Sequence, residues 1–248
     1  MTLFDAHFHV IDPRFPLVPN NAYLPEPFTV ADYRERVEPL HVTGGAVVSG
    51  SFQAFDQSYL KDALAQLGPG FAGVTQIPAD TSDDDILALD RANVRAVRFN
   101  LYRGGSATLK DVDTLARRVH EIAGWHSEFY LDAADFAELE PILAALPQIS
   151  IDHLAMSDDA SGALLRLVGS GTVVKATGFG RIAVTDPDAL MHAVVSVNPA
   201  ALIFGTDLPS TRAAVPFQDN DIARIAQAVG AEHVEAVLDS NAREFYRV

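Results

Sequence analysis

The chain lacks cysteine altogether across its 248 residues. That absence excludes disulfide bonds, thiolate nucleophiles and zinc sites with cysteine ligands. Long apolar runs are also missing, and no stretch reaches the roughly 20 residues that a membrane-spanning helix requires. The first residues enter a strand pattern directly, without the basic segment that begins a signal peptide. We therefore expect no membrane span and a cytoplasmic location.

Basic side chains are scarce in this sequence. It has 18 Lys and Arg against 33 Asp and Glu, which gives a formal net charge of −15. A surface this acidic repels phosphate backbones and anionic lipids, so we expect neither nucleic acid nor a membrane surface as a partner. A small anionic substrate stays compatible with the composition, because a few arginines set the potential inside a pocket.

The glycine-rich phosphate turn of dinucleotide-binding folds is absent after the first apolar run. Instead, eight short strand-like runs alternate with eight segments of helical spacing. The strands are expected at Leu3–His9, Gly45–Ser51, Phe71–Ile77, Val94–Asn100, Ser127–Asp132, Ile149–His153, Thr172–Ala176 and Ala201–Gly205. The helices are expected at Val30–Leu40, Gln57–Leu67, Asp83–Ala92, Lys110–Ala123, Ala133–Leu146, Asp159–Val168, Pro187–Val197 and Asn220–Val229. This order predicts a single-domain (β/α)8 TIM barrel over residues 1–248, with a doubly wound open sheet as the alternative.

One connector of the expected barrel is long. Residues 12–28 (DPRFPLVPNNAYLPEPF) contain five prolines and follow the first strand directly. A loop in that position would lie over the barrel mouth, where the carboxyl ends of the strands meet. The alternative is a plain surface loop.

The first strand contains the run DAHFH at positions 5–9. Because successive side chains of a strand alternate between its faces, we expect Asp5, His7 and His9 on one face, with Phe4 and Phe8 on the other. A carboxylate and two imidazoles are costly to bury unless they are hydrogen-bonded, bound to a metal ion or lining a polar pocket.

Polar residues stand at the expected ends of seven of the eight strands, where barrel enzymes place their working groups. They include His153 after the sixth strand and Asp207 after the eighth. Together with His7 and His9, these residues form a nitrogen-rich set completed by one carboxylate. Such a set can hold a zinc ion with one position open to water. It can also hold a substrate carbonyl by hydrogen bonds while the aspartate acts as a base.

Other polar residues fit less specific interpretations. Lys175, at the end of the seventh strand, either pairs with Asp207 or contacts substrate, or else belongs to a structural ion pair. The remaining histidines fall in expected helices or loops and are interpreted as solvated or capping residues. They are His41, His120, His126, His192 and His233.

Five segments, in chain order, carry a family resemblance: DAHFHVIDPRFPLVPNNAYLP, RAVRFNLYR, GWHSEFYLDAADFAELEPILAALPQISIDHLA, VVKATGFGRI and IFGTDLP. Between residues 3 and 210 they resemble the amidohydrolase superfamily of (β/α)8 barrels, and within it the 2-pyrone-4,6-dicarboxylate lactonases. The run SNAREFY near the end resembles the closing helix of that family.

The resemblance implies a hydrolase that opens lactones, which are cyclic esters, without a metal cofactor. It implies that His7, His9 and His153 polarise the lactone carbonyl and that Asp207 takes a proton from the attacking water. Family positions that contact the rest of an anionic substrate match Tyr23, Ser51, Arg98, Tyr130 and Arg181, with Arg103 offset by one residue. If a zinc or manganese ion is bound instead, the same four catalytic candidates would be its ligands.

The sequence departs from the family pattern at several site positions. Met156 stands where the family has an arginine, Gln53 replaces a histidine, and the family's GTDWPHP reads GTDLPST here. The lost groups weaken the grip on a second carboxylate. We therefore expect a lactone with one carboxylate, or a sugar-acid lactone, held by Arg98 and Arg181.

Two other functions remain as alternatives. The first is a metal-dependent hydrolase or decarboxylase of another amidohydrolase branch, although Tyr130 occupies a position where metal-rich branches have a histidine. The second is a binding protein without turnover, which would have no need for a base beside an oxyanion site.

Overall fold

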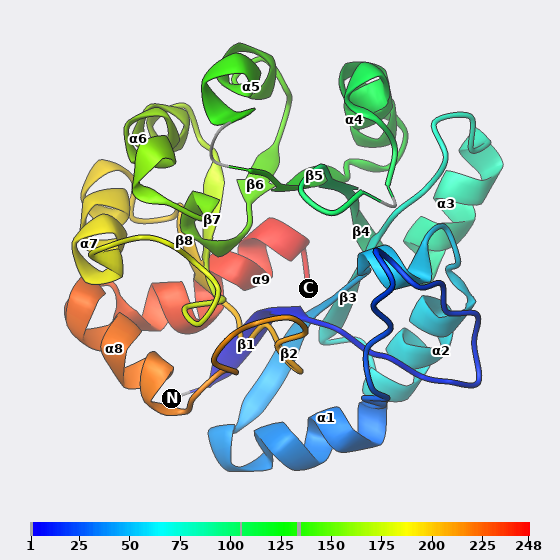
Figure 1. Cartoon of the computed structure of the whole chain (residues 1–248), viewed down its shortest axis with the longest axis horizontal. Coiled ribbons are helices and arrows are strands. Elements are labelled where there is room, and N and C mark those ends of the chain that lie inside the picture. The colour runs from blue at the N-terminus through cyan, green and yellow to red at the C-terminus, as the bar shows by residue number, and fades with distance from the viewer. Residues whose placement is uncertain (1, 105, 133–134) are drawn as a thin grey trace.

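Eight parallel strands, each hydrogen-bonded to the next along the chain, form one sheet in the order β1 to β8. The computed structural model describes residues 2–104, 106–132 and 135–248. The strands are β1 Leu3–Phe8, β2 Val42–Val48, β3 Phe71–Thr75, β4 Val94–Asn100, β5 His126–Tyr130, β6 Ile149–Ile151, β7 Val173–Ala176 and β8 Leu202–Phe204. The sheet curls into a barrel with the helices outside it (Figure 1). The predicted single-domain (β/α)8 barrel is therefore confirmed, and the open-sheet alternative is wrong because the strand order never reverses.

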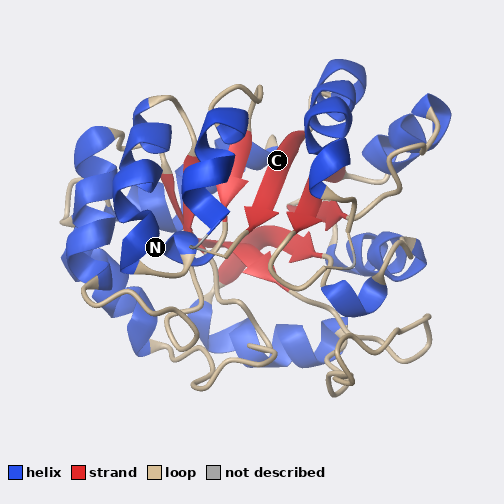
Figure 2. Ribbon diagram, turned by 45° about the horizontal axis from the view of Figure 1, so that its top comes forward, coloured by secondary structure: helices blue, strands red, loops and turns tan. Residues whose placement is uncertain are grey.

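The helices cover the outside of the barrel, and the strand arrows point toward the edge where the long loops gather (Figure 2). The helices are α1 Val30–Val37, α2 Ser58–Leu67, α3 Asp83–Arg91, α4 Leu109–Ala123, α5 Phe136–Leu143, α6 Ser161–Gly169, α7 Pro187–Val197, α8 Asn220–Val229 and α9 Asn241–Tyr246. Local signals set several starts: the Ser82 and Asp186 side chains accept from the backbone amides of Asp85 and Ala189. The first two residues of the helix expected at 133–146 lie outside the described residues.

Two apolar layers hold the barrel together. The outer layer packs the helices on the strands, as where Phe8 of β1 stacks on Tyr33 of α1 with ring centroids 3.7 Å apart. The inner layer fills the barrel with small side chains such as Ala46 and Ala72, because its interior is narrow. Helix α9 closes the amino-terminal end, where the Tyr246 hydroxyl donates to the Ala6 carbonyl at 3.2 Å. The segment that resembled a closing helix is thus a helix.

The expected alternation along β1 is wrong. Phe4 packs inside the barrel, whereas Phe8 packs outside it against α1. The register slips between Asp5, which pairs with Gly45 of β2, and Phe8, which pairs with Val47, so three steps of β1 oppose two of β2. A bulge of this kind reverses the faces of the residues beyond it. Asp5, before the bulge, faces α1, where Tyr33 donates to its carboxylate at 3.0 Å, while the histidines after it turn inward.

The two ends of the sheet meet at the carboxyl side of the barrel. The Asp207 amide donates to the His7 carbonyl and the His9 amide donates to the Leu208 carbonyl, both at 2.7 Å. Gly205 permits this approach, since a Cβ there would lie 2.7 Å from the His7 nitrogen. Barrel closure and the positions of His7, His9 and Asp207 therefore depend on the same contacts.

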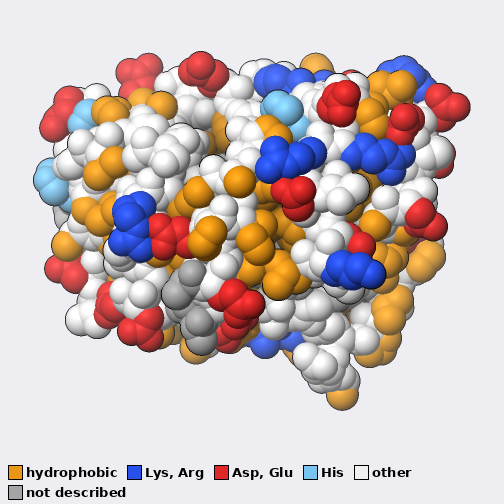
Figure 3. Space-filling model, turned by 90° about the horizontal axis from the view of Figure 1, so that it is seen from above, with side chains coloured by type: hydrophobic (Ala, Val, Ile, Leu, Met, Phe, Trp, Pro, Cys, Tyr) orange, Lys and Arg blue, Asp and Glu red, His pale blue; other side chains and the backbone are white. Residues whose placement is uncertain are grey.

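Among the described residues, no helix is long and apolar enough to cross a membrane. On the face seen in Figure 3, acidic side chains are interspersed with basic and apolar ones rather than gathered in one patch. Inside the barrel, by contrast, ionised side chains lie beside partners of opposite charge.

Candidate functional site

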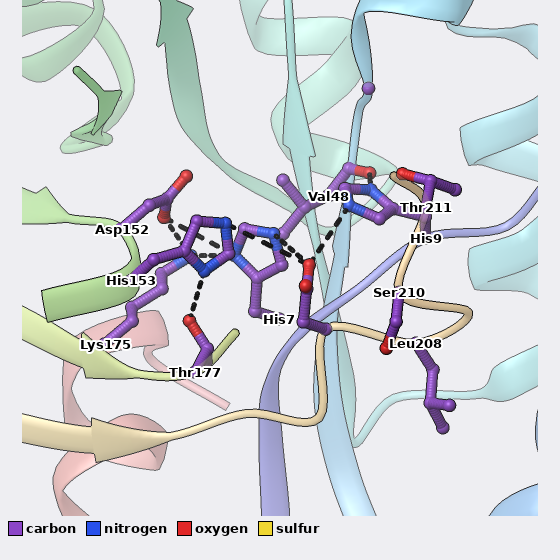
Figure 4. Close-up of polar contacts among 12 residues, drawn as sticks. His7, His9, Val48, Asp152, His153, Lys175, Thr177, Leu208, Ser210 and Thr211 are labelled. Carbon is purple, nitrogen blue, oxygen red and sulfur yellow. Dashed lines mark hydrogen bonds and ion pairs between the residues drawn. The ribbon is translucent and has the colours of Figure 1, made fainter. Parts of the chain in front are cut away.

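Asp207 lies at the centre of three imidazoles. Its Oδ1 atom is 3.8 Å from His7 Nε2, 3.7 Å from His9 Nε2 and 4.0 Å from His153 Nε2. All four side chains are buried. The structure thus brings together the four residues that the sequence singled out, although they come from three separate strand ends. Figure 4 shows the three histidines of this group side by side.

The backbone at this centre is strained. His153 has a φ of 52° and Asp207 a φ of 59°, both in the left-handed region that residues other than glycine rarely adopt. Such a conformation costs on the order of 1–3 kcal/mol and persists only where the surroundings enforce it. Here it aims both side chains at the point where the strand ends converge.

An arginine keeps Asp207 ionised. The Arg181 Nη2 atom lies 2.6 Å from Asp207 Oδ2 and also donates to the Thr211 carbonyl at 2.8 Å. Burial alone would raise the pKa of Asp207, but Arg181 and the surrounding imidazoles hold the pKa of its carboxyl well below its ordinary value. The Oδ1 atom accepts no hydrogen bond from any described residue.

Two of the imidazoles, those of His7 and His153, are held neutral. Burial lowers the pKa of His7 to about 4, even though Asp152 partly opposes the shift. Burial also lowers the pKa of His153 well below its ordinary value. At neutral pH, each of these rings therefore carries one proton that it can donate and one lone pair.

Beneath the histidines, Lys175 joins two strands by ion pairs inside the barrel. Its Nζ atom lies 2.5 Å from Glu128 Oε2 on β5 and 3.4 Å from Asp152 Oδ1 after β6. It also lies 3.2 Å from His7 Nδ1. Of the predicted roles for Lys175, the structural ion pair is the one present among the described residues, and its partners are not Asp207.

His126 departs from its expected role. It opens β5 instead of lying in a loop, is buried, and contacts Glu128 at 3.1 Å through Nε2. The interpretation of His126 as a solvated or capping residue is therefore wrong. Glu128, which the sequence analysis did not single out, shares its strand face with Tyr130 two residues later and is the signal that was missed.

A pocket opens directly above the centre. The residues that line it are His9, Tyr23, Gly50, Ser51, Phe52, Arg98, Asn100, Arg103, Tyr130, His153, Arg181, Thr211 and Arg212. All six candidates for substrate contact are among them, including Arg103 despite its offset. Tyr23 comes from the loop 12–28, whose Asn20 side chain donates to the Arg103 carbonyl at 3.1 Å.

Arg212 is a pocket residue that sequence reasoning missed. Its guanidinium lies over the Tyr23 ring at 4.4 Å and donates to Asn20. Neither Arg212 nor Arg103 forms an ion pair with an acidic side chain in the described parts of the chain. The sequence analysis expected the lost family groups to weaken the binding of a second carboxylate, whereas Arg212 adds one cation to the pocket.

The side chains of Arg98 and Gln53 form hydrogen bonds with other parts of the protein. Arg98 lines the pocket, yet its guanidinium donates to Asp152 at 2.8 Å and to the Ser49 carbonyl at 2.8 Å. Gln53 lies outside the pocket lining, donates to the Val10 carbonyl and accepts from the Gly50 amide. Arg98 therefore positions Asp152 as well as facing the pocket.

The spacing of the site residues would admit a divalent ion. The ligand atoms of His7, His9 and Asp207 lie within 4.8 Å of one another, as do those of His7, Asp152 and His153. Imidazole and carboxylate donors suit zinc or manganese. Both groups include His7, so the fit depends on which nitrogen of His7 carries its proton.

Comparison with known proteins defines the family. The family model described as Amidohydrolase matches residues 4–248. The chain belongs to the amidohydrolase family. The resemblance found in the sequence is confirmed, and the protein is accordingly an enzyme of the amidohydrolase superfamily.

Three relatives illustrate the range of the family. The chain is 29% identical over 232 residues, 83% of its length and 76% of the other's, to a 2-pyrone-4,6-dicarboxylate hydrolase of Comamonas testosteroni. It is 23% identical over 241 residues, 90% of its length and 82% of the other's, to a D-galactarolactone isomerase of Agrobacterium fabrum. A crystal structure from Pseudomonas putida, provisionally assigned as a 2-pyrone-4,6-dicarboxylic acid hydrolase, superposes with a TM-score of 0.85 at 25% identity. It covers 99% of this chain and 97% of its own.

Proposed function

We propose that this enzyme hydrolyses a lactone of a small carboxylated compound, with Asp207 as the base. The observation that carries the proposal is a pair of buried atoms without hydrogen-bond partners among the described residues. These atoms are His7 Nε2 and Asp207 Oδ1, 3.8 Å apart. Buried polar atoms are normally satisfied, so an unpaired set beside a pocket is suited to a water molecule and a substrate oxygen. One relative is named for a 2-pyrone dicarboxylate, whose ring is a cyclic ester, and another for a galactarolactone.

The residues suggest distinct roles in the reaction. The Nδ1 atom of His9 is 2.7 Å from the Val48 carbonyl, which can only accept, so the neutral form of His9 has its lone pair on Nε2. A water molecule between His9 Nε2 and Asp207 Oδ1 would donate to both acceptors and turn its own lone pair toward the lactone carbonyl. His7 and His153 remain as donors to the carbonyl oxygen, which departs from the shared role that the family resemblance implied for all three histidines.

The proton and electron balance of the step is simple. As the water oxygen bonds to the carbonyl carbon, its proton passes to Asp207 and the carbonyl oxygen becomes negative. Donors aimed at that oxygen stabilise the tetrahedral intermediate, which is usually the largest contribution to catalysis of acyl transfer. The ring C–O bond then breaks, and the leaving oxygen takes the proton back from Asp207.

The substrate is proposed to be anionic. Arg103 and Arg212 face the pocket without acidic partners among the residues that the structure describes, and burial together with Arg103 lowers the pKa of Arg212 from its ordinary value. A substrate carboxylate would relieve this repulsion. The matching tests are lactones with two, one and no carboxylates, assayed by proton release, with kcat/KM expected to fall as carboxylates are removed.

An isomerase is the second candidate, because one relative is named for that reaction. In that case a hydroxyl of the substrate replaces water as the nucleophile at the same carbonyl. Reaction in H2¹⁸O separates the two functions. One ¹⁸O atom in a ring-opened carboxylate supports hydrolysis, whereas an unlabelled lactone with a new ring supports isomerisation.

A further inference from the structure

The three histidines differ in the groups that contact their Nδ1 atoms. His9 Nδ1 faces a backbone carbonyl, an obligatory acceptor. His153 Nδ1 lies 2.6 Å from the Thr177 hydroxyl, which can donate or accept and therefore fixes nothing. His7 Nδ1 lies 3.2 Å from the Lys175 ammonium, which has only donors. Figure 4 shows Lys175 reaching His7 from the side opposite to His9.

One competing contact bears on His7. Asp152 Oδ1 lies 3.4 Å from His7 Nδ1 and could accept a proton from it. The same oxygen lies 3.4 Å from Lys175 Nζ, so the ammonium balances its charge, although the oxygen accepts no hydrogen bond from any described residue. A proton on Nδ1 would face the N–H groups of an ammonium held 3.2 Å away by Glu128 and Asp152. The arrangement with Nδ1 as an acceptor avoids that repulsion and uses two Lys175 donors, one toward Glu128 and one toward His7.

We propose that Lys175 is a positioning residue that fixes His7 as the tautomer with its proton on Nε2, and thereby withholds His7 from cations. The Nε2 proton then points toward Asp207 Oδ1, where the unpaired atoms of the site meet. His7 becomes a donor and His9 an acceptor. A divalent ion at His7, His9 and Asp207 needs lone pairs on both rings, which this tautomer denies it.

This inference deepens the proposed function, which supplies the oxygen that His7 would meet. The tautomer itself is a property of the free protein and is tested without substrate. Two-dimensional ¹⁵N–¹H correlation spectra of the full chain, with His7 assigned from a His7→Gln variant, distinguish a protonated from an unprotonated Nδ1. We expect Nδ1 of His7 unprotonated and Nδ1 of His9 protonated at pH 7.5. A protonated Nδ1 on His7 would overturn the inference, whatever the enzyme hydrolyses.

A double substitution that removes the Lys175 ammonium should move the proton of His7 from Nε2 to Nδ1. Lys175→Met combined with Glu128→Gln removes one charge of each sign, so the net charge inside the barrel is unchanged. Without the ammonium, His7 Nδ1 should donate to Asp152, and Nε2 should become a free ligand. We expect the His7 spectrum to change tautomer and the affinity for Co²⁺, followed by its visible absorption, to rise at least 10-fold over wild type. Lys61→Met, on the exposed surface of α2, is the control and should leave both readouts unchanged.

Two outcomes contradict the proposal. Wild-type protein that binds Co²⁺ as tightly as the double variant would show that Lys175 withholds nothing. A double variant that keeps the wild-type His7 tautomer would show that another contact fixes it. If the double variant does not fold, the wild-type spectrum alone decides. Failure of lactone hydrolysis would leave the spectrum unaffected, so the two proposals fail separately.

Discussion

Replacing Asp207 with asparagine tests the proposed base most directly. Asparagine keeps the size of the side chain but cannot take a proton from water. Loss of a general base reduces turnover by roughly 10²–10⁴. Asp207 does not line the pocket, and its charge is removed from beside Arg181, so the KM for an anionic substrate should stay the same or fall. The expected signature is a large loss of kcat without a rise in KM.

The same substitution has a cost in stability that the assay must accommodate. It leaves Arg181 buried without its acidic partner, and breaking a buried ion pair from one side costs about 3–5 kcal/mol. In a chain of this size, each kcal/mol lowers Tm by about 2–4 °C, so Tm should fall by roughly 6–20 °C. Rates should therefore be measured well below the transition of the variant, with its folded fraction checked by circular dichroism.

Asp12→Asn is the matched control, because it removes another Asp–Arg pair, at 2.6 Å, from residues outside the pocket lining. It should keep wild-type kcat. If Asp207→Asn retains kcat within about threefold of wild type, Asp207 is not the base. If kcat stays intact while KM rises strongly, Asp207 binds substrate instead, and the mechanism proposed here is refuted.

Arg212→Gln should raise the KM for a dicarboxylated lactone at least 10-fold and change the KM for an uncharged one little, as initial rates would show. Gly205→Ala should lower Tm and kcat together, because the new Cβ would lie 2.7 Å from the His7 nitrogen. The free energy of unfolding should fall by up to about 3 kcal/mol between pH 6.5 and pH 4, because unfolded His7 binds a proton there and native His7, with a pKa of about 4, does not. Urea titrations of wild type and His7→Gln should differ by that amount. Dialysis against a chelator should leave lactone hydrolysis unchanged; activity lost and then restored by zinc would favour the metal-dependent alternative.

The fold was predictable because its signals are local. Each strand and helix of the barrel carries its own periodicity, and the ends of helices such as α3 and α7 carry capping residues that mark the first turn. The site was predictable in composition for a related reason. In a barrel, the ends of strands converge, so polar residues at those ends indicate one shared location.

What the sequence did not reveal depends on contacts between distant segments. The bulge in β1 arises from its register with β2, and strict alternation placed Asp5 on the wrong face. His126 lies one residue before its expected strand, and its burial depends on Glu128 and α9. Arg212 has no distinctive neighbours in sequence and enters the pocket through its packing on Tyr23, nearly 190 positions away.

The charges inside the barrel bear on both proposals, an anionic substrate and a site that withholds His7 from cations. Its buried acids are matched by its buried bases, with the imidazoles of His7 and His153 neutral. The six ionised groups are Arg98, Lys175 and Arg181 against Glu128, Asp152 and Asp207. A divalent ion on Asp207 would compete with Arg181 for its carboxylate and would add positive charge across the His7 ring from the Lys175 ammonium. A substrate carboxylate would instead be attracted, because Arg103 and Arg212 line the pocket without acidic partners among the described residues. This charge balance is the electrostatic argument for the proposed activation of the carbonyl by hydrogen bonds.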